Sequence, residues 1–409
     1  MTYKIGLFLA ARPFDGGAFQ YSQAMLEAVA ALKSKEFEVV VGYRHDLWID
    51  KIIEKDLMPL KLSFNLWGRL GGRRISGVLP MKLWHKFSPF FHPMVRKMIR
   101  QKCTLWIFPA QDSWGYLIPV RSIGVIYDLM HRYEKQFSEV SARKQFEIRE
   151  KHYRNMCRWS QEIIVDSNVG KKHVQECYSM DPAKIHVLPF TAPSYIHKAI
   201  TPNITNNPFR LPQKYFFYPA QFWKHKNHQS LLYAIAGLKS EINDLKFVFV
   251  GSPKNGYKST IALAKKLNLM NNIIILGYVP DSEISELYQR ARALIMPTFF
   301  GPTNIPPLEA IAVGCPVAVS DIYGMREQLG NAAIYFNPTS ITEIMNTMKL
   351  LWLDDSVCKK LSQRGLVQAS KWNQTGFNIK FECIIKSVLK DQQTPINEIS
   401  QIKATASLY

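Results

Sequence analysis

The chain has 409 residues, with 52 Lys and Arg against 32 Asp and Glu and a formal net charge of +20. A hydrophobic content of 47% excludes an intrinsically disordered protein, and the lack of any apolar run near ~20 residues excludes a helical membrane span. The length predicts two domains, because a single hydrophobic core stops growing at about 250–300 residues. The six cysteines have no metal-ligand spacing, and the first residues predict a buried strand instead of a signal peptide. We therefore expect a cytoplasmic protein.

The first half of the chain alternates short apolar runs with helical stretches. Strands are predicted at 4–11, 37–43, 104–110, 122–129, 162–167 and 184–190. A helix is predicted at 19–34, directly after the first strand. Strands that alternate with helices form parallel sheets covered on both faces. Residues 1–190 are therefore predicted to form an α/β, Rossmann-like domain.

A second alternating series follows residues 191–210, which gather Pro, Asn and Thr and are predicted to be a linker. Its strands are predicted at 215–222, 245–251, 272–279, 293–300 and 316–321. Residues 211–372 should then form a second Rossmann-like domain. Residues 373–390 are predicted to be a helix that crosses back to the first domain, and 391–409 a flexible tail. Two such domains predict a cleft, with ligands at the carboxyl ends of the strands.

The positive charge is concentrated in one stretch. Residues 57–111 contain ten Lys or Arg and no Asp or Glu, interleaved with Trp and Phe. This pattern suits an anionic membrane surface or a lipid-linked substrate, and equally a solvated basic face with inward aromatic rings. A nucleic acid is the weakest of the three interpretations. The candidate membrane contacts are Arg73, Arg74, Lys82 and Lys86.

Two short blocks follow predicted strands. Gly16 and Gly17 come between the first strand and the first helix, where backbone without a Cβ lets a phosphate or sugar approach closely. Taken alone this signal is weak, because a glycine pair more often marks only a turn, and no third glycine completes a dinucleotide fingerprint. Lys226 stands at a predicted helix start, where cations are disfavoured. An ordinary surface lysine is the alternative; this misfit, together with the family resemblance given below, favours phosphate binding by Lys226.

Residues 301–321 read GPTNIPPLEAIAVGCPVAVSD, a loop that enters a short helix and then a strand. Proline is tolerated in the first helical turn, and the unpaired N–H groups there attract anions. The loop also delivers one carboxylate, Glu309. Amides for a diphosphate and a carboxylate for ribose hydroxyls suit a nucleotide, although Glu309 alone would also complement the helix dipole.

These blocks, in this order, resemble family 4 glycosyltransferases of the GT-B fold (glycosyl transferases group 1). The family loop normally reads EGFGLPPLEA, so Gly301 replaces its first glutamate. Gln221 stands at the family's arginine, and Tyr127 at the histidine of its HDL segment. The resemblance implies two Rossmann-like, doubly wound domains facing a cleft, with the acceptor on the first domain. It also implies transfer of a hexose, with retention, from a nucleoside-diphosphate sugar to a glycan or lipid-linked acceptor in surface polysaccharide assembly.

The resemblance carries residue roles with it. Lys226, Glu309 and Asp128 form the predicted catalytic group, with Gly16, Gly17, Lys226, Asn304 and Ile305 at the donor phosphate and sugar, Glu309 at the ribose, Tyr278 at the base, and Tyr127 and His131 at the acceptor or sugar. A structural histidine is an equally good interpretation of His131. The family mechanism relies on positioning and on charge stabilisation at the leaving group.

Other functions have less support. The chain has no D-x-D, HExxH, G-x-S-x-G or Walker A sequence, so no metal or cofactor is expected. The departures at Gly301, Gln221 and Tyr127 leave open a degenerate nucleotide-sugar-binding subunit or scaffold. A basic nucleic-acid-binding protein remains a further alternative, but no recognition motif supports it. We also leave open a peripheral position on the cytoplasmic face of the membrane.

Overall fold

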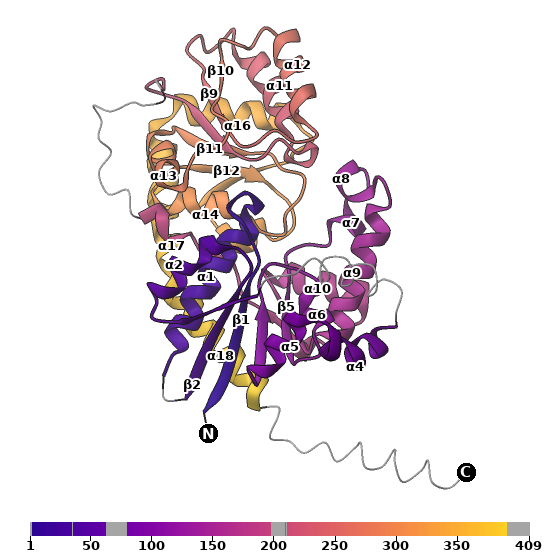
Figure 1. Ribbon diagram of the computed structural model, residues 1–409. Helices are drawn as coiled ribbons and strands as arrows, with labels where there is room; N and C mark the ends of the chain where they lie inside the picture. Colours follow the sequence, from indigo (N-terminus) through magenta and orange to yellow (C-terminus); the bar gives the residue numbers. More distant parts are fainter. Residues whose placement is uncertain (1, 35, 63–79, 198–208, 210, 391–409) are drawn as a thin grey trace.

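The structure, a computed structural model, describes residues 2–34, 36–62, 80–197, 209 and 211–390 (Figure 1). It contains two parallel sheets flanked by helices. The seven-stranded sheet has the order β3-β2-β1-β4-β5-β6-β7, and the six-stranded sheet the order β10-β9-β8-β11-β12-β13. This arrangement confirms the prediction of an α/β fold with two Rossmann-like domains.

The strands of the first sheet are β1 (Tyr3–Leu9), β2 (Phe37–Tyr43), β3 (Met58–Lys61), β4 (Leu105–Phe108), β5 (Ser122–Ile126), β6 (Glu162–Val165) and β7 (Ile185–Val187). Those of the second are β8 (Phe216–Pro219), β9 (Phe247–Val250), β10 (Ile273–Ile275), β11 (Ala293–Met296), β12 (Val317–Ser320) and β13 (Ala333–Phe336). The edge strands β3 and β13 were not predicted. Strand β3 contains a proline and is largely exposed, so it lacks the apolar run that marks a buried strand.

The helices of the first domain are α1 (Gly17–Leu32), α2 (Ile49–Ile53), α4 (Met81–Phe91), α5 (Pro93–Arg100), α6 (Trp114–Leu117), α7 (Met130–Tyr133), α8 (Ser138–Ser141), α9 (Gln145–Trp159) and α10 (Asn168–Tyr178). Those of the second are α11 (His228–Leu238), α12 (Tyr257–Lys266), α13 (Asp281–Arg290), α14 (Ile305–Ala312), α15 (Met325–Leu329), α16 (Ile341–Leu353) and α17 (Asp355–Lys371). Short 3-10 turns that matter below are η1 (Pro13–Asp15), η4 (Ser194–His197) and η5 (Lys224–Lys226).

The last described helix, α18 (Gln374–Lys390), packs against α1 of the first domain (Figure 1). The amide Nε2 of Gln374 donates to the carbonyl of Ala24 at 3.0 Å, and the indole N–H of Trp372 donates to the carbonyl of Phe190 at 2.9 Å. Phe377 is fully buried in this contact region. Trp372 and α18 therefore tie the two domains together.

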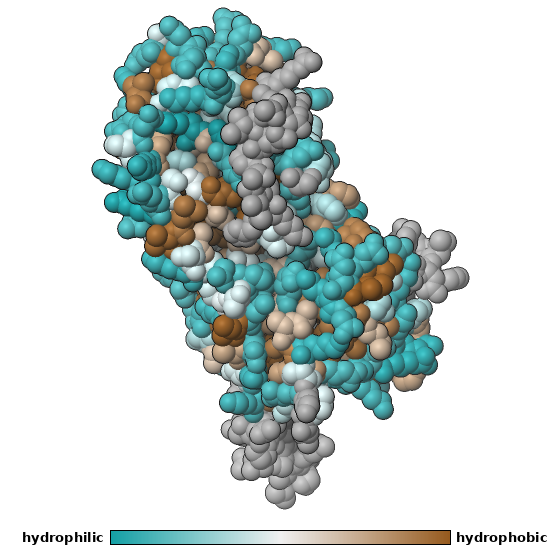
Figure 2. All heavy atoms as spheres, turned by 90° about the vertical axis from the view of Figure 1, so that its left-hand side faces the viewer, coloured by the Kyte–Doolittle hydropathy of each residue, from teal (hydrophilic) through white to brown (hydrophobic). Residues whose placement is uncertain are grey.

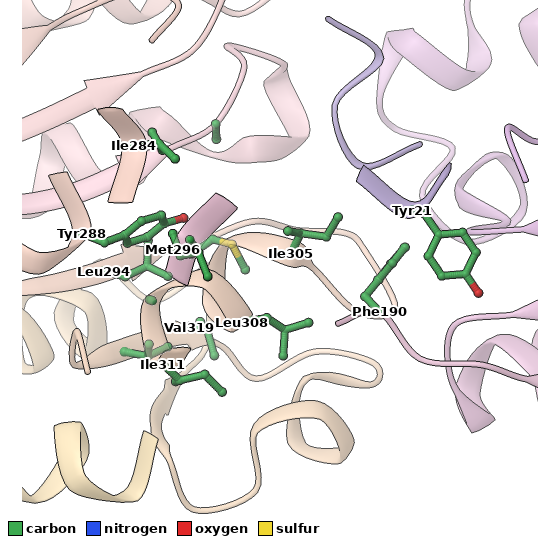
Figure 3. Packing of buried hydrophobic residues seen from close by; sticks show 14 of the residues in the cluster. Tyr21, Phe190, Ile284, Tyr288, Leu294, Met296, Ile305, Leu308, Ile311 and Val319 are labelled. Carbon is green, nitrogen blue, oxygen red and sulfur yellow. The ribbon is translucent and has the colours of Figure 1, made fainter. Parts of the chain in front are cut away.

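One hydrophobic core runs through both domains. Ile305 and Leu308 at the start of α14 lie between the second-domain core and Phe190 and Tyr21 of the first domain (Figure 3). The surface drawn in Figure 2 is mainly hydrophilic, with small separate apolar patches. Within the described ranges, no helix has the length and apolarity needed to cross a bilayer.

Candidate active site at the domain interface

Glu309 lies in the buried first turns of α14 and is 5% exposed. Its Oε2 accepts a hydrogen bond from the hydroxyl of Tyr288 at 2.6 Å, and its Oε1 accepts one from Tyr195 of η4. Burial raises the pKa of the Glu309 carboxyl, and the two phenol hydrogen bonds act in the opposite direction. The sequence analysis did not identify either tyrosine, because both lie outside the motif that contains Glu309.

Lys226 ends η5 and precedes Asn227, which has a left-handed φ of 58° and begins α11. The side chain of Asn227 donates to the carbonyls of Pro297 and Pro338, each at 2.9 Å. These bonds fix η5 against the ends of β11 and β13 and thereby position the neighbouring lysine. The Nζ of Lys226 lies 3.3 Å from the Oδ1 of Asn304. Lys226 and the loop before α14 are therefore adjacent.

Burial lowers the pKa of Lys226 to about 8, and the carboxylate of Asp128 in the first domain acts in the opposite direction. Asp128 follows β5 and is held by an ion pair, with 2.6 Å between its Oδ1 and a guanidinium nitrogen of Arg149. Its Oδ1 also accepts from the N–H of Met130 at 2.9 Å. Asp128 is thus fixed within electrostatic range of the lysine across the domain boundary.

Gly301 and Asn304 are matched to each other. Gly301 has a φ of +128°, and a Cβ at this position would lie 2.4 Å from the Nδ2 of Asn304. In the family loop EGFG, the first position is a glutamate and the fourth is a glycine. In this chain the first position is Gly301 and the fourth is Asn304, so the side chain has changed places. The Asn304 amide therefore occupies the space beside Lys226 that opens when residue 301 has no side chain.

The backbone of Asn304 is also engaged. Its N–H donates to the Oε1 of Gln328 at 3.1 Å, and its carbonyl accepts from the Nε2 of Gln328 at 2.8 Å. Pro306 and Pro307 have no N–H, so the first turn of α14 offers fewer amide donors than an ordinary helix start. Fewer backbone amides are therefore free at this loop than the sequence analysis expected.

The glycine pair of the first domain faces this loop. Gly16 has a φ of +60° with open space around it, and a Cβ on Gly17 would lie 3.5 Å from the Cδ1 of Ile305. Gln221, at the position of the family's arginine, donates from Nε2 to the carbonyl of Phe14 at 3.3 Å. The structure therefore brings Gly16, Gly17 and Ile305 together across the domain boundary.

Further contacts between the domains lie beside the loop. The Thr303 hydroxyl donates to the Oδ2 of Asp166, which follows β6 and is 2% exposed. Burial raises the pKa of Asp166 to about 7. Ser167 caps the start of α10, because its hydroxyl accepts from the N–H of Gly170 at 3.0 Å. The contact between Asp166 and Thr303 was missed, because no motif marks it.

Glu139 of α8 makes a second contact between the domains. Its Oε1 accepts from the backbone N–H of His225 at 3.1 Å and lies 2.8 Å from the Nδ1 of that residue. Its Oε2 accepts from Asn255 at 2.8 Å. Burial raises the pKa of Glu139, but the hydrogen bonds from His225 and Asn255 outweigh it and hold the pKa at about 2. This contact holds the backbone next to Lys226.

Two predicted acceptor residues are less accessible than expected. The Tyr127 hydroxyl donates to the carbonyl of Pro109, and its ring stacks on Phe190. His131 is fully buried, with its Nε2 at 3.3 Å from both Glu150 and Tyr178. Burial lowers the pKa of His131 to about 4, so its imidazole is neutral near pH 7. The structure therefore places His131 inside the first domain and does not bring it to the cleft surface.

The remaining predicted residues lie apart from this centre. Tyr278 follows β10 and is 64% exposed. Arg73 and Arg74 lie outside the described residues, while Lys82 and Lys86 are exposed on α4. A separate cavity of about 790 Å³ lies beside the ends of β12 and β13 and has Glu134, Asp321 and Glu343 in its wall. Among the described residues no group of three metal-binding side chains occurs.

Residues 200–367 match the family model of the glycosyl transferases group 1. The chain is 29% identical over 163 residues to O-antigen chain mannosyltransferase B of Escherichia coli, which covers 39% of this chain and 42% of that protein. It is 28% identical over 178 residues to O-antigen chain mannosyltransferase RfbU of Salmonella typhimurium, which covers 43% and 46%. Both alignments span less than half of the relative's length.

Solved structures share the fold. A glycosyltransferase from Rickettsia africae superposes with a TM-score of 0.69 at 16% identity, covering 95% of this chain and 99% of that one. Anabaena HepE, solved in complex with UDP-glucose, superposes with a TM-score of 0.67 at 14% identity, covering 94% and 99%. The fold and the matched sequence region agree. The chain therefore has the GT-B fold, and its residues 200–367 match the glycosyl transferases group 1.

Proposed function

We propose that this chain is a glycosyltransferase that moves a hexose, with retention, from a nucleoside-diphosphate sugar to a glycan or lipid-linked acceptor in surface polysaccharide assembly. The observation that carries the proposal is the position of Lys226 beside Asn304 and the start of α14, opposite the Gly16–Gly17 turn. The O-antigen mannosyltransferases among its relatives support the polysaccharide setting.

In this proposal Lys226 binds the diphosphate and stabilises the negative charge that grows as the sugar departs. Its lowered pKa of about 8 still leaves most of the amine protonated at pH 7. Asn304, held beside Lys226, orients the sugar end of the donor, and Tyr278 lies beside the base. Retention then follows from attack on the same face of the sugar, with the departing phosphate taking the acceptor proton. We propose that this step uses no metal or cofactor.

Glu309 is assigned to the ribose. Both of its oxygens already accept a phenol hydrogen bond. A carboxylate has about four acceptor positions, so ribose hydroxyls can bind without breaking these bonds. The two tyrosines then position the carboxylate for the ribose.

Titration calorimetry with UDP, GDP and ADP and their sugars tests the donor site. Lys226→Ala should weaken binding of the preferred nucleotide by roughly 10- to 150-fold, the value of a charge-assisted hydrogen bond of about 1.5–3 kcal/mol. Lys224→Ala is the matched control, because Lys224 is exposed on the same turn. Failure of every nucleotide to bind the wild-type chain would refute the proposal.

A nucleotide-sugar-binding subunit without catalytic activity is the second candidate. The absence of the family's glutamate and arginine at Gly301 and Gln221 favours it. Incubation of the purified chain with the donor that binds best separates the two. Release of free sugar or transfer to an added glycan supports the enzyme, and intact donor after prolonged incubation supports the subunit.

We also propose that α4 lies against an anionic membrane. This helix is on the part of the first domain turned away from the second domain (Figure 1). It exposes four large apolar side chains next to Lys82 and Lys86: Leu83, Phe87, Phe90 and Phe91. Lys82→Gln with Lys86→Gln should reduce sedimentation with phosphatidylglycerol vesicles, whereas Lys265→Gln with Lys266→Gln on α12 should not. Equal sedimentation of both double variants contradicts this orientation.

A further inference from the structure

Helix α15 lies directly against the loop that precedes α14. Gly324 stands immediately before this helix, and a Cβ on it would lie 2.5 Å from the carbonyl oxygen of Pro302, so a glycine is needed for the helix and the loop to approach this closely. The next residue, Met325, is fully buried, and its Sδ lies 3.8 Å from the Nδ2 of Asn304. Several residues of each segment therefore build this contact.

Gln328 of α15 binds the backbone of Asn304 with both ends of its side-chain amide. Its Oε1 accepts from the N–H of Asn304 at 3.1 Å, and its Nε2 donates to the carbonyl of the same residue at 2.8 Å. The two bonds fix the peptide groups on both sides of the Asn304 Cα, and the side chain on this Cα has its Oδ1 3.3 Å from the Nζ of Lys226. Gln328 is itself held from α17, because the Nε2 of Gln368 donates to its carbonyl at 3.2 Å.

The residue before Gln328 contacts the first domain. Both oxygens of Glu327 accept from the backbone N–H of Asn168, at 3.0 and 3.2 Å, and Oε1 also accepts from the Nδ2 of Asn168 at 2.8 Å. Asn168 is the first residue of α10, where a carboxylate also interacts favourably with the helix dipole. Two adjacent residues of α15 therefore bind the first domain and the donor loop.

These contacts form a closed ring across the domain boundary. The segment 166–168 of the first domain holds the donor loop, because the Thr303 hydroxyl donates to Asp166, and it holds α15 through Asn168. Gln328 then joins α15 to the residue after Thr303. A displacement of the segment 166–168 therefore acts on the donor loop by two routes, directly and through α15.

We propose that Gln328 is a positioning residue for the nucleotide-sugar donor and that Glu327 connects it to the first domain. Gln328 holds the Asn304 side chain beside Lys226, and Glu327 holds α15 where this contact requires it. The proposal rests on the function proposed above, in which Lys226 and Asn304 bind the diphosphate and the sugar end of the donor. A binding side chain that is fixed in advance loses less conformational freedom when the ligand arrives, so Gln328 should raise the affinity for the donor.

Titration calorimetry on the full chain, with UDP, GDP and ADP and their sugars, tests this role. Gln328→Met keeps the length of the side chain but removes both hydrogen bonds, so it should weaken binding of the preferred nucleotide sugar about fivefold, the value of one ordinary hydrogen bond. Glu327→Ala, at an exposed position, should weaken it in the same direction. The matched control is Glu241→Ala, because Glu241 is exposed and its ion pair with Lys349 lies within the second domain. The nucleoside monophosphates lack the β-phosphate and the sugar, and they should bind all of these variants alike.

A double-variant cycle separates positioning from a merely structural role. If Gln328 acts through the Asn304 side chain, Gln328→Met should change donor affinity less than about 1.5-fold in the Asn304→Ala background. The same loss in both backgrounds, an equal loss of monophosphate affinity, or wild-type donor affinity in Gln328→Met overturns the positioning role and leaves the proposed function standing. Wild-type donor affinity in Glu327→Ala overturns the connection to the first domain. Failure of the wild-type chain to bind any nucleotide refutes the proposed function, and the positioning role with it.

Discussion

The pairing of Gly301 with Asn304 leads to a quantitative prediction. In Gly301→Ala the new Cβ would lie 2.4 Å from the Nδ2 and 2.9 Å from the Oδ1 of Asn304, at a φ of +128°. This φ lies in a region that is strained for any residue with a Cβ, at a cost of about 1–3 kcal/mol. The displaced amide would also lose its contact with Lys226, which is long at 3.3 Å and contributes at most about 1.5 kcal/mol.

Together these two effects predict a loss of about 1–4.5 kcal/mol. Scanning calorimetry measures this as a fall in Tm of roughly 2–4 °C per kcal/mol for a domain of this size. Nucleotide titration on the same protein should show weaker binding, because Lys226 loses its neighbour. The double variant Gly301→Ala with Asn304→Gly removes the collision but keeps the strained φ, so it should recover part of the lost stability.

Gly330→Ala is the control. Gly330 also has a positive φ of +54°, but a Cβ there would find its nearest neighbour at 3.9 Å. It should lower the Tm through backbone strain alone and leave nucleotide affinity unchanged. A wild-type Tm for Gly301→Ala, or a double variant no more stable than the single one, would refute the matched-pair explanation.

Three further results are expected. Asp166→Asn should make the free energy of unfolding depend less on pH between about pH 4 and 7. Burial raises the pKa of Asp166 in the folded protein to about 7. The stability that the protonated side chain contributes is therefore complete below the pKa of the unfolded state and is lost as the pH rises toward 7. Urea unfolding at several pH values measures this, and parallel profiles for both proteins contradict it. Glu309→Gln should weaken the binding of UDP or GDP at least tenfold, but should weaken the binding of inorganic diphosphate less than twofold. An equal loss of affinity for the nucleotide and for diphosphate would exclude a ribose contact. Glu139→Gln should speed amide exchange at residues 224–227 severalfold, because it weakens the hydrogen bond to a backbone N–H there, whereas exposed Glu147→Gln should not.

The fold was predictable because its signals are local. Buried strands such as 105–108 and 293–296 are continuous apolar runs, and helices such as 228–238 carry an apolar stripe. Strands β3 and β13 were not predicted. Each lies at the edge of its sheet, is four residues long and is only partly buried or exposed. For such a strand the pairing partner supplies the stability, and the partner is remote in the sequence.

The candidate site was predictable in part. Motifs located Lys226, Glu309 and the Gly16–Gly17 turn, because each follows a strand at the edge where ligands bind. The two tyrosines on Glu309 and the contact of Gln328 with Asn304 had no signal, since their members are separated by about 20 to more than 100 residues. His131 stood near a motif, and only its complete burial revealed a place inside the domain.

By itself, the sequence determined the α/β class, the two domains and the side chains available for a nucleotide, because periodicity and glycine or proline placement act over a few residues. Only the tertiary structure decided which of those side chains are free to act. Hydrogen bonds from distant segments engage both oxygens of Glu309 and the backbone of Asn304. Among the described residues they leave one oxygen of Asp112 without a partner. The reason is physical: burial and hydrogen bonding depend on which elements meet in space, and that depends on the packing of the whole chain.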